Sequence, residues 1–305
     1  MKKSVISLVC WMAALGLAHK PVVLWHGMGD SCCDPESMGR VAGLIQEALP
    51  GTFVHSVQIG DDPDSDANAG FFGNINEQLE KVCNDLAEIP ELQDGFNAIG
   101  FSQGGQFLRG YVQRCNQPAI HNLITFGSQH AGVSDIPGCA DQPDFRCNLM
   151  RSIARRGVYT DYVRKHIIQA QYYKDPKNYD VYLNKNIFLP DINNEFLLHK
   201  NKTYKQNLLS LNKLVLIKFA EDETVRPAES AWFWFYNEEG DLIPLEDQPL
   251  YTKDWLGLKT LNEDNRIDFE VCPGAHMRIS DEYLIMIVSK YLSSDLPLLM
   301  QQTPA

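Results

Sequence analysis

One short segment, Gly100-Phe101-Ser102-Gln103-Gly104, constrains the fold of this chain more than any other part of its sequence. It follows an apolar run at 96–99 that predicts a strand, and it precedes a stretch with helical spacing that begins near Gln103. Glycines on both sides of the serine allow the sharp strand-to-helix turn that pushes a serine hydroxyl into the open. The segment therefore predicts a strand–turn–helix unit of an α/β fold, with Ser102 as a candidate nucleophile.

Short apolar runs alternate with helical stretches along most of the chain. This order predicts a mostly parallel central sheet with helices on both faces, as in the α/β-hydrolase fold. A strand is expected at 52–59, strands followed by loops are expected within 21–27, 121–130 and 266–276, and a strand that ends in acidic residues is expected within 211–222. Helices are expected at 37–49, 71–89 and 280–292.

The stretch 138–210 breaks this alternation and is rich in Tyr, Asn and basic residues. We interpret 19–305 as a single domain in which 138–210 is an insertion over the carboxyl edge of the sheet. Because ligands of open α/β sheets bind at that edge, we expect the insertion to border a substrate groove.

Residues 1–18 have the pattern of a secretory signal peptide. Two lysines precede an uncharged stretch, 4–18, which ends in small residues suited to cleavage after Ala18. That stretch is shorter than the ~20 residues that a membrane span needs. No other stretch of the sequence is long enough, so no transmembrane anchor is expected.

The charge and the cysteines narrow the class of protein further. The formal net charge of −12 argues against nucleic acid as a partner. Of eight cysteines, Cys10 lies in the signal peptide, and the other seven should mostly pair in an oxidising compartment. No CxxC or HxxxH spacing points to a metal site. The sequon at Asn201 fits the same secretory route.

A serine nucleophile needs a base to remove its proton, and the base needs an acid to orient it. In this fold these groups follow the serine in the order acid, histidine. His276 lies in the loop after the last predicted strand and is the only histidine beyond residue 199. The acid should follow the strand that ends at Phe219, where Glu221, Asp222 and Glu223 occur. We favour Asp222, although spacing alone does not separate the three.

The tetrahedral intermediate of acyl transfer needs two hydrogen-bond donors for its oxyanion. One is expected to be the backbone N–H of Gln103, directly after the nucleophile. The other is expected from the loop 25–29, where Met28 N–H is the candidate, unless this loop is an ordinary turn.

Two other segments each allow two interpretations. The acidic loop 61–66 could bind calcium, but it lacks the glycine and the final glutamate of an EF-hand, so we expect a solvated loop. The aromatic run 232–236 could line an acyl groove or pack in the core.

Several motifs resemble the palmitoyl-protein thioesterases of the lysosomal type 1 family. The most specific are HGMGDSCC (26–33), GFSQGGQFLR (100–109) and CPGAHMRIS (272–280), and the similarity extends from about Pro21 to about Leu292. This family removes long-chain fatty acyl groups from cysteine thioesters on proteins, without a metal or cofactor. The resemblance implies a triad of Ser102, Asp222 and His276, with Met28 and Gln103 as oxyanion donors.

The resemblance also implies how the cysteines pair and where the protein acts. The implied disulfides leave Cys272 free, and Asn201 matches a glycosylation position of the family. The implied location is the lysosome or vacuole, or the outside of the cell, with S-acylated proteins as substrates. The implied disulfides are Cys32–Cys33, Cys83–Cys115 and Cys139–Cys147.

Two alternatives remain open at this point. An ester lipase or an acyl-CoA thioesterase would have the same triad and differ only in its groove. A binding protein on a hydrolase scaffold would usually lack a member of the triad, and candidates for all three members are present here.

Overall fold

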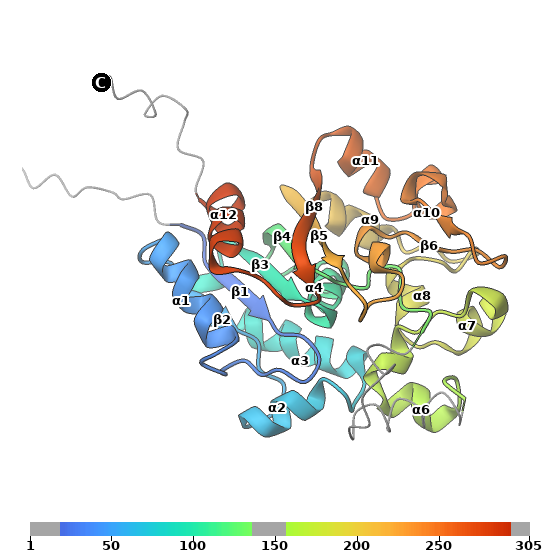
Figure 1. Cartoon of the computed structure of the whole chain (residues 1–305), viewed down its shortest axis with the longest axis horizontal. Helices are drawn as coiled ribbons and strands as arrows, with labels where there is room; N and C mark the ends of the chain where they lie inside the picture. Colours follow the sequence, from blue (N-terminus) through green and yellow to red (C-terminus); the bar gives the residue numbers. More distant parts are fainter. Residues whose placement is uncertain (1–18, 136–156, 294–305) are drawn as a thin grey trace, which may run out of the picture.

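A computed structural model of the chain describes residues 19–135 and 157–293. Within these residues, six strands form one parallel sheet with the order β2-β1-β3-β4-β5-β8 (Figure 1). The sheet confirms the predicted fold class. Its strands are β1 (Val22–Trp25), β2 (Val54–Ser56), β3 (Phe96–Phe101), β4 (Ile120–Phe126), β5 (Lys213–Glu221) and β8 (Ile267–Ala275).

The central strands are buried on both faces, which explains why their sequences are apolar runs without alternation. In β1, Val23 and Trp25 belong to one hydrophobic core, while Val22 and Leu24 belong to the core on the opposite face. Successive side chains of a strand point to opposite faces, so four consecutive apolar residues serve two cores.

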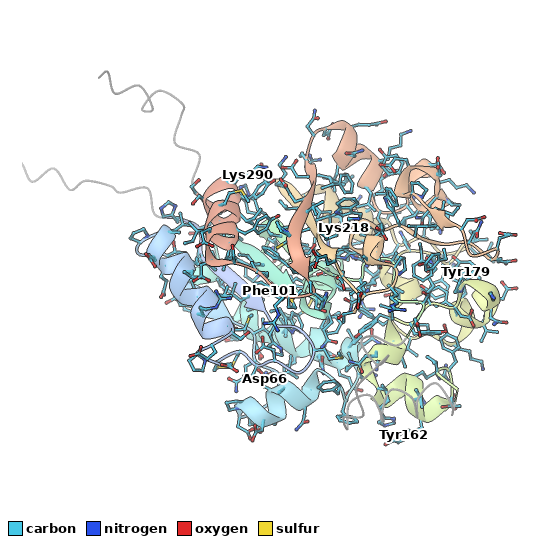
Figure 2. All side chains as sticks on the ribbon, viewed as in Figure 1. Asp66, Phe101, Tyr162, Tyr179, Lys218 and Lys290 are labelled. Atoms are coloured by element: carbon cyan, nitrogen blue, oxygen red, sulfur yellow. A yellow bond between two sulfur atoms is a disulfide. The ribbon has the colours of Figure 1, made fainter. Side chains whose placement is uncertain are left out.

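Helices cover both faces (Figures 1 and 2). Each places apolar residues at helical spacing against the sheet, as Ile75, Leu79, Val82 and Leu86 do in α3. One core is covered by α1 (Met38–Ala48) and α12 (Asp281–Leu292), and the other by α3 (Ile75–Ala87), α4 (Gln103–Arg114) and α9 (Lys202–Leu209).

The described part of the expected insertion, 157–210, packs on the α4 side of the sheet. The fully buried Arg109 of α4 ties the two together, because its guanidinium donates to the Ile192 carbonyl (2.9 Å) and to Asn193 Oδ1 (2.8 Å). The elements in this region are α6 (Asp161–His166), η2 (Ile168–Gln171), η3 (Pro176–Asn178), α7 (Tyr179–Lys185) and α8 (Leu189–Ile192).

Short elements connect β5 to β8. In the aromatic run 232–236, Phe233 and Phe235 are buried, and the Trp232 indole donates to the Leu216 carbonyl (2.9 Å). The elements here are η4 (Ala228–Trp232), β6 (Phe235–Tyr236), β7 (Leu242–Ile243), η5 (Leu245–Asp247), α10 (Pro249–Thr252) and α11 (Leu258–Glu263).

The acidic segment 61–66 is not the solvated loop that we expected. Its second half begins helix α2 (Pro63–Ala69), and Asp62 caps this helix by accepting the Ser65 N–H (2.8 Å). Asp66 is fully buried. The expectation is therefore wrong for Asp66, whose side chain faces the interior because the helix turns it inward.

No helix in the described ranges combines the length and the apolar character needed to cross a membrane.

Candidate active site

Ser102 lies at the turn between β3 and α4, in a strained backbone conformation with φ of +51°. The glycines of the G-x-S-x-G segment make this turn possible. A Cβ atom at Gly100 would lie 2.2 Å from Gly105 Cα, and one at Gly104 would lie 2.2 Å from the Trp25 carbonyl oxygen. The first turn of α4 thus packs directly on β1 and β3, and Ser102 is held at the carboxyl edge of the sheet.

The three residues expected to form a triad lie in one hydrogen-bonded chain. His276 Nε2 lies 3.0 Å from Ser102 Oγ, and His276 Nδ1 lies 2.7 Å from Asp222 Oδ2. An ionised carboxylate can only accept, so Nδ1–H donates to Asp222 and Nε2 is left to accept the Ser102 hydroxyl proton. This is the arrangement in which an imidazole can act as a base towards a serine.

Neighbouring parallel strands bring these residues together. Asp222 directly follows β5 and His276 directly follows β8, and the two strands pair so that Glu221 is opposite Ala275. The Asp222 carboxylate also accepts the backbone N–H groups of Thr224 and Val225, both at 2.9 Å. Its side chain is only 1% exposed.

Glu221 and Glu223, which spacing could not separate from Asp222, are both exposed to solvent. Of the three acids, the structure places Asp222 against the histidine.

The loop expected to supply an oxyanion donor lies against the serine. A Cβ atom at Gly27 would lie 3.3 Å from Ser102 Cβ, and Met28 and Ser102 line the same pocket. Gln103 is the first residue of α4, and its side chain accepts from the Tyr172 hydroxyl (3.2 Å) and donates to the Gly70 carbonyl (3.1 Å). Both expected donors therefore adjoin Ser102.

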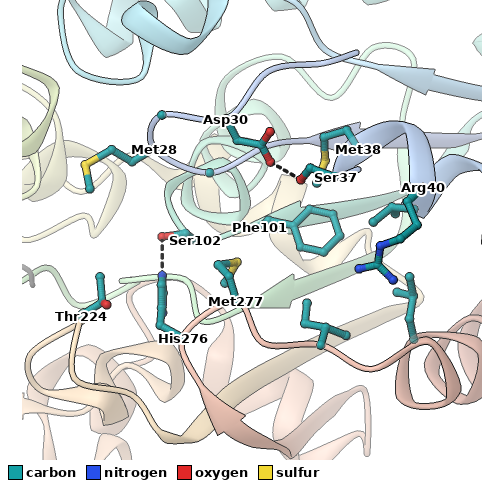
Figure 3. Close-up of a pocket in the computed structure, with 15 residues that line it drawn as sticks. Met28, Asp30, Ser37, Met38, Arg40, Phe101, Ser102, Thr224, His276 and Met277 are labelled. Atoms are coloured by element: carbon teal, nitrogen blue, oxygen red, sulfur yellow. Dashed lines mark hydrogen bonds between the residues drawn. The ribbon is translucent and has the colours of Figure 1, made fainter. Parts of the chain in front are cut away.

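A cavity of about 370 Å³ opens beside Ser102 and His276 (Figure 3). It lies between α1 and the segment that leads from β8 into α12. Its polar side chains include Asp30, which accepts from the Ser37 hydroxyl (2.5 Å), and Arg40, which pairs with Asp281. The apolar side chains that line it are Met28, Met38, Val41, Phe101, Met277, Ile279 and Leu284.

This cavity is not where we expected the substrate groove. None of its lining residues belongs to the described part of the insertion, 157–210, or to the aromatic run 232–236. The location of the substrate groove therefore stays a prediction.

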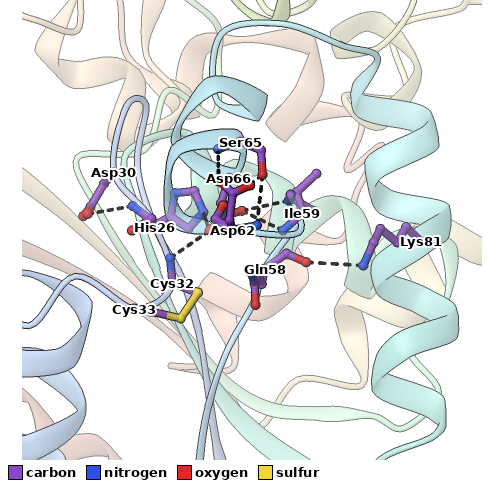
Figure 4. Close-up of a disulfide and its surroundings, with 12 residues drawn as sticks. His26, Asp30, Cys32, Cys33, Gln58, Ile59, Asp62, Ser65, Asp66 and Lys81 are labelled. Carbon is purple, nitrogen blue, oxygen red and sulfur yellow. Dashed lines mark hydrogen bonds and ion pairs between the residues drawn. A yellow bond between two sulfur atoms is a disulfide. The ribbon is translucent and has the colours of Figure 1, made fainter.

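The loop that carries Met28 is held by a buried ion pair (Figure 4). His26 Nε2 lies 3.2 Å from Asp66 Oδ2, and the side chains are 3% and 0% exposed. Asp66 also accepts the backbone N–H groups of Cys32 (2.8 Å) and Ile59 (2.7 Å). Asp66 in α2 thereby fixes both ends of the 26–32 loop.

The pair shifts the titration of both groups. Burial opposes the charged form of His26, but Asp66, the Gly27 carbonyl and Asp30 together outweigh it, so the pKa of His26 lies above its usual value of 6.5. Burial likewise opposes ionisation of Asp66, but His26 and the Cys32 N–H outweigh it, so the pKa of Asp66 lies below 3.8. In the sequence, the acidic segment 61–66 was the one available signal of a partner for His26.

The structure joins Cys32 to Cys33 and Cys83 to Cys115 by disulfide bonds, and Cys272 is free and buried. Cys139 and Cys147 lie outside the described residues, as does the expected signal peptide.

Asn201 is exposed at the start of α9, where its side chain accepts the Thr203 N–H at 3.0 Å. Within the described ranges, no group of three His, Cys, Asp or Glu side chains is arranged to hold a metal ion.

The strand order and the Ser102 turn at the end of β3 define the class of this protein: it has the α/β-hydrolase fold. Comparison with known proteins then gives the family. The sequence profile of the palmitoyl protein thioesterase family matches residues 21–276, so the chain belongs to that family and is a thioesterase.

Known relatives agree with this assignment. The chain is 46% identical to palmitoyl-protein thioesterase 1 of Caenorhabditis elegans over 275 residues, which cover 89% of this chain and 91% of the relative. It is 37% identical to palmitoyl-protein thioesterase 3 of Dictyostelium discoideum, with 90% of each chain covered. It is 30% identical to a lysosomal thioesterase PPT2 homolog of Drosophila melanogaster, with 88% of this chain and 89% of the relative covered.

Proposed function

We propose that this thioesterase removes long-chain fatty acyl groups, such as palmitoyl, from S-acylated cysteines of proteins, with Ser102, His276 and Asp222 as its catalytic triad. The observation that carries the proposal is the hydrogen-bonded chain from Ser102 Oγ through His276 to Asp222, beside an apolar cavity. The names of the relatives support the same substrate class.

The first half of the reaction forms an acyl-enzyme. His276 Nε2 takes the hydroxyl proton as Ser102 Oγ attacks the thioester carbonyl carbon. The carbonyl oxygen becomes an oxyanion, which accepts hydrogen bonds from the backbone N–H groups of Met28 and Gln103. The C–S bond then breaks, and the cysteine thiolate takes the proton from the His276 imidazolium. A thiolate is a good leaving group because the pKa of a free cysteine is about 8.5.

The second half returns the enzyme to its starting state. His276 takes a proton from a water molecule, whose oxygen attacks the acyl carbon, and the same oxyanion contacts serve again. The bond to Ser102 Oγ breaks, and the serine regains its proton from His276. Asp222 stabilises the imidazolium in both halves and keeps Nδ1 protonated between them.

The cavity between α1 and the β8–α12 segment receives the acyl chain in this proposal. Its volume falls in the range of small-molecule sites, about 300–1,000 Å³. Burial of each methylene group contributes roughly 0.8 kcal/mol, so an apolar lining favours long acyl chains over short ones.

We further propose that the enzyme reaches the lysosome or vacuole, or is secreted, after loss of residues 1–18 and glycosylation at Asn201. The two disulfides support an oxidising route, since cytosolic proteins rarely keep them. The printed name of the Drosophila relative also includes the word lysosomal.

The test combines labelling with a substrate comparison. A fluorophosphonate probe should label wild-type enzyme at Ser102 and leave Ser102→Ala unlabelled, while both proteins give the same circular dichroism spectrum. Wild-type enzyme should cleave a palmitoyl thioester faster than the matching oxygen ester. Labelling at another residue contradicts the triad, and preference for the oxygen ester favours a lipase.

A further inference from the structure

A second groove, of about 620 Å³, lies in the part of the molecule formed by α7, the β6–β7 hairpin and α10. It shares no lining residue with the cavity beside Ser102. Figure 1 draws α7, β6 and α10 at one end of the molecule and α1 and α12 at the other, with the end of β8 between them. Tyr179, one of the residues that line this groove, is labelled in Figure 2.

The floor of this groove is apolar and aromatic. Leu197, at its edge, is 71% exposed, and the neighbouring Leu198 is 89% exposed. These two leucines extend the apolar surface of the groove into solvent. The apolar and aromatic lining comprises Tyr179, Leu183, Leu197, Phe235, Tyr236, Ile243, Leu250 and Trp255.

The charges within the floor satisfy one another. Lys174 Nζ lies 2.7 Å from Glu195 Oε1, and the Tyr182 hydroxyl donates to the other oxygen of Glu195. The Lys174 ammonium group also lies over the rings of Tyr179 (5.4 Å) and Phe235 (5.1 Å). The charged side chains of the floor itself therefore compensate one another, and Lys200, which is not a lining residue, places its ammonium group over the Trp255 ring, 3.3 Å from the ring centroid.

The rim, in contrast, is acidic. Asp180, Glu238, Glu239 and Asp247 line it and are exposed, and within the described part of the chain none of them forms an ion pair. One lysine, Lys253, shares the rim with these four carboxylates. A ligand that places apolar groups on the floor would bring its outer groups against this negative rim, so those groups should be cationic.

We propose that this groove binds the basic, amphipathic segment beside the acylated cysteine of a protein substrate. This inference rests on the proposed function, because the segment belongs to the protein part of the substrate, whereas the cavity at Ser102 receives only the acyl chain. Segments with several lysines or arginines commonly accompany lipid anchors, since one acyl chain alone holds a protein weakly at an anionic membrane. A phosphocholine headgroup fits less well, because its phosphate would face the same carboxylates.

The kinetic test uses a triple variant that neutralises the rim, Asp180→Asn with Glu238→Gln and Glu239→Gln. Its matched control is Glu80→Gln with Glu88→Gln and Glu91→Gln. These exposed acids lie on α3 and in and before η1 (Pro90–Leu92), and the control removes the same number of charges.

The substrates are an S-palmitoyl peptide with arginines and leucines, its analogue with glutamine for arginine, and a small neutral palmitoyl thioester. At low ionic strength, KM for the basic peptide should rise about tenfold in the rim variant, which is the effect expected from the loss of a few exposed ion pairs. In the control variant, KM for this peptide should stay unchanged. The kcat, and all rates on the small thioester, should not change. Equal KM values for rim and control variants would overturn the proposal.

A binding test separates this proposal from the catalytic one. A dye-labelled basic peptide without the acyl group should bind wild-type enzyme by fluorescence anisotropy. Rim neutralisation, Leu197→Ser and high salt should each weaken binding, whereas the control variant should not. Peptide binding is measured without turnover, so the test of the groove remains valid even if the proposed thioester substrate is wrong. Failure of the peptide to bind, or binding of phosphatidylcholine vesicles in its place, would refute the peptide as the occupant.

Discussion

The buried pair of His26 and Asp66 predicts that Asp66→Asn weakens both stability and catalysis. Asparagine keeps the shape of the side chain but removes the charge that faces His26, and it leaves one oxygen to accept the N–H groups of Cys32 and Ile59. Breaking a buried ion pair usually costs about 3–5 kcal/mol. Since His26 can respond by losing its proton, we expect about 2–3 kcal/mol of lost unfolding free energy.

The loss should depend on pH in a defined direction. The pKa of His26 is raised in the folded protein, so its contribution is complete below 6.5 and is lost as the pH rises through the folded-state pKa. The pKa of Asp66 is lowered, so its contribution is present above 3.8 and is lost as the pH falls through its folded-state value. The difference in stability between wild type and Asp66→Asn should therefore be largest between these two reference values and shrink towards alkaline pH.

Urea unfolding at a series of pH values measures this difference, with Asp64→Asn as the control. Asp64 is an exposed acid of the same helix, so its substitution should change stability little. Turnover by Asp66→Asn should fall by about tenfold, less than the 10²–10³-fold loss from removing an oxyanion donor outright. A stability difference that stays constant or grows as the pH rises from 6.5 towards alkaline values would refute the reasoning.

Three further predictions concern the site itself. Asp222→Asn should lower kcat by about 10⁴-fold with little change in KM, whereas the exposed Glu223→Gln should have little effect; similar losses in both would remove the acid assignment. Ile279→Trp should reduce turnover of a hexadecanoyl thioester at least tenfold more than turnover of a butanoyl thioester, because the indole would fill the cavity beside Ser102. Equal losses of turnover with the two substrates would argue against acyl binding in this cavity. Replacement of Cys32 and Cys33 by serine should lower activity but change the melting temperature little, because a disulfide between adjacent residues closes a very small ring and gives little chain-entropy benefit. A large drop in melting temperature at full activity would contradict this.

Sequence alone determined the features of this protein that depend on neighbouring residues. The Ser102 turn was predictable because the apolar strand, the two glycines and the helix that form it follow one another directly in the sequence. The fold class followed from the alternation of strands and helices, because that alternation limits how a sheet can be covered. His276 could be chosen by order alone, since no other histidine follows the candidate acids at 221–223.

Only the tertiary structure decided among groups that are equivalent in local sequence. Glu221, Asp222 and Glu223 have the same chemistry within three positions, and the pairing of β5 with β8 turns Asp222 towards the histidine. The partnership of His26 and Asp66 joins residues far apart in the chain. It depends on how α2 packs beside the loop after β1, which no local pattern encodes. The same reason explains why the cavity at Ser102 lies against α1 and α12: packing of distant elements, and not local periodicity, determines where space remains at the edge of a sheet.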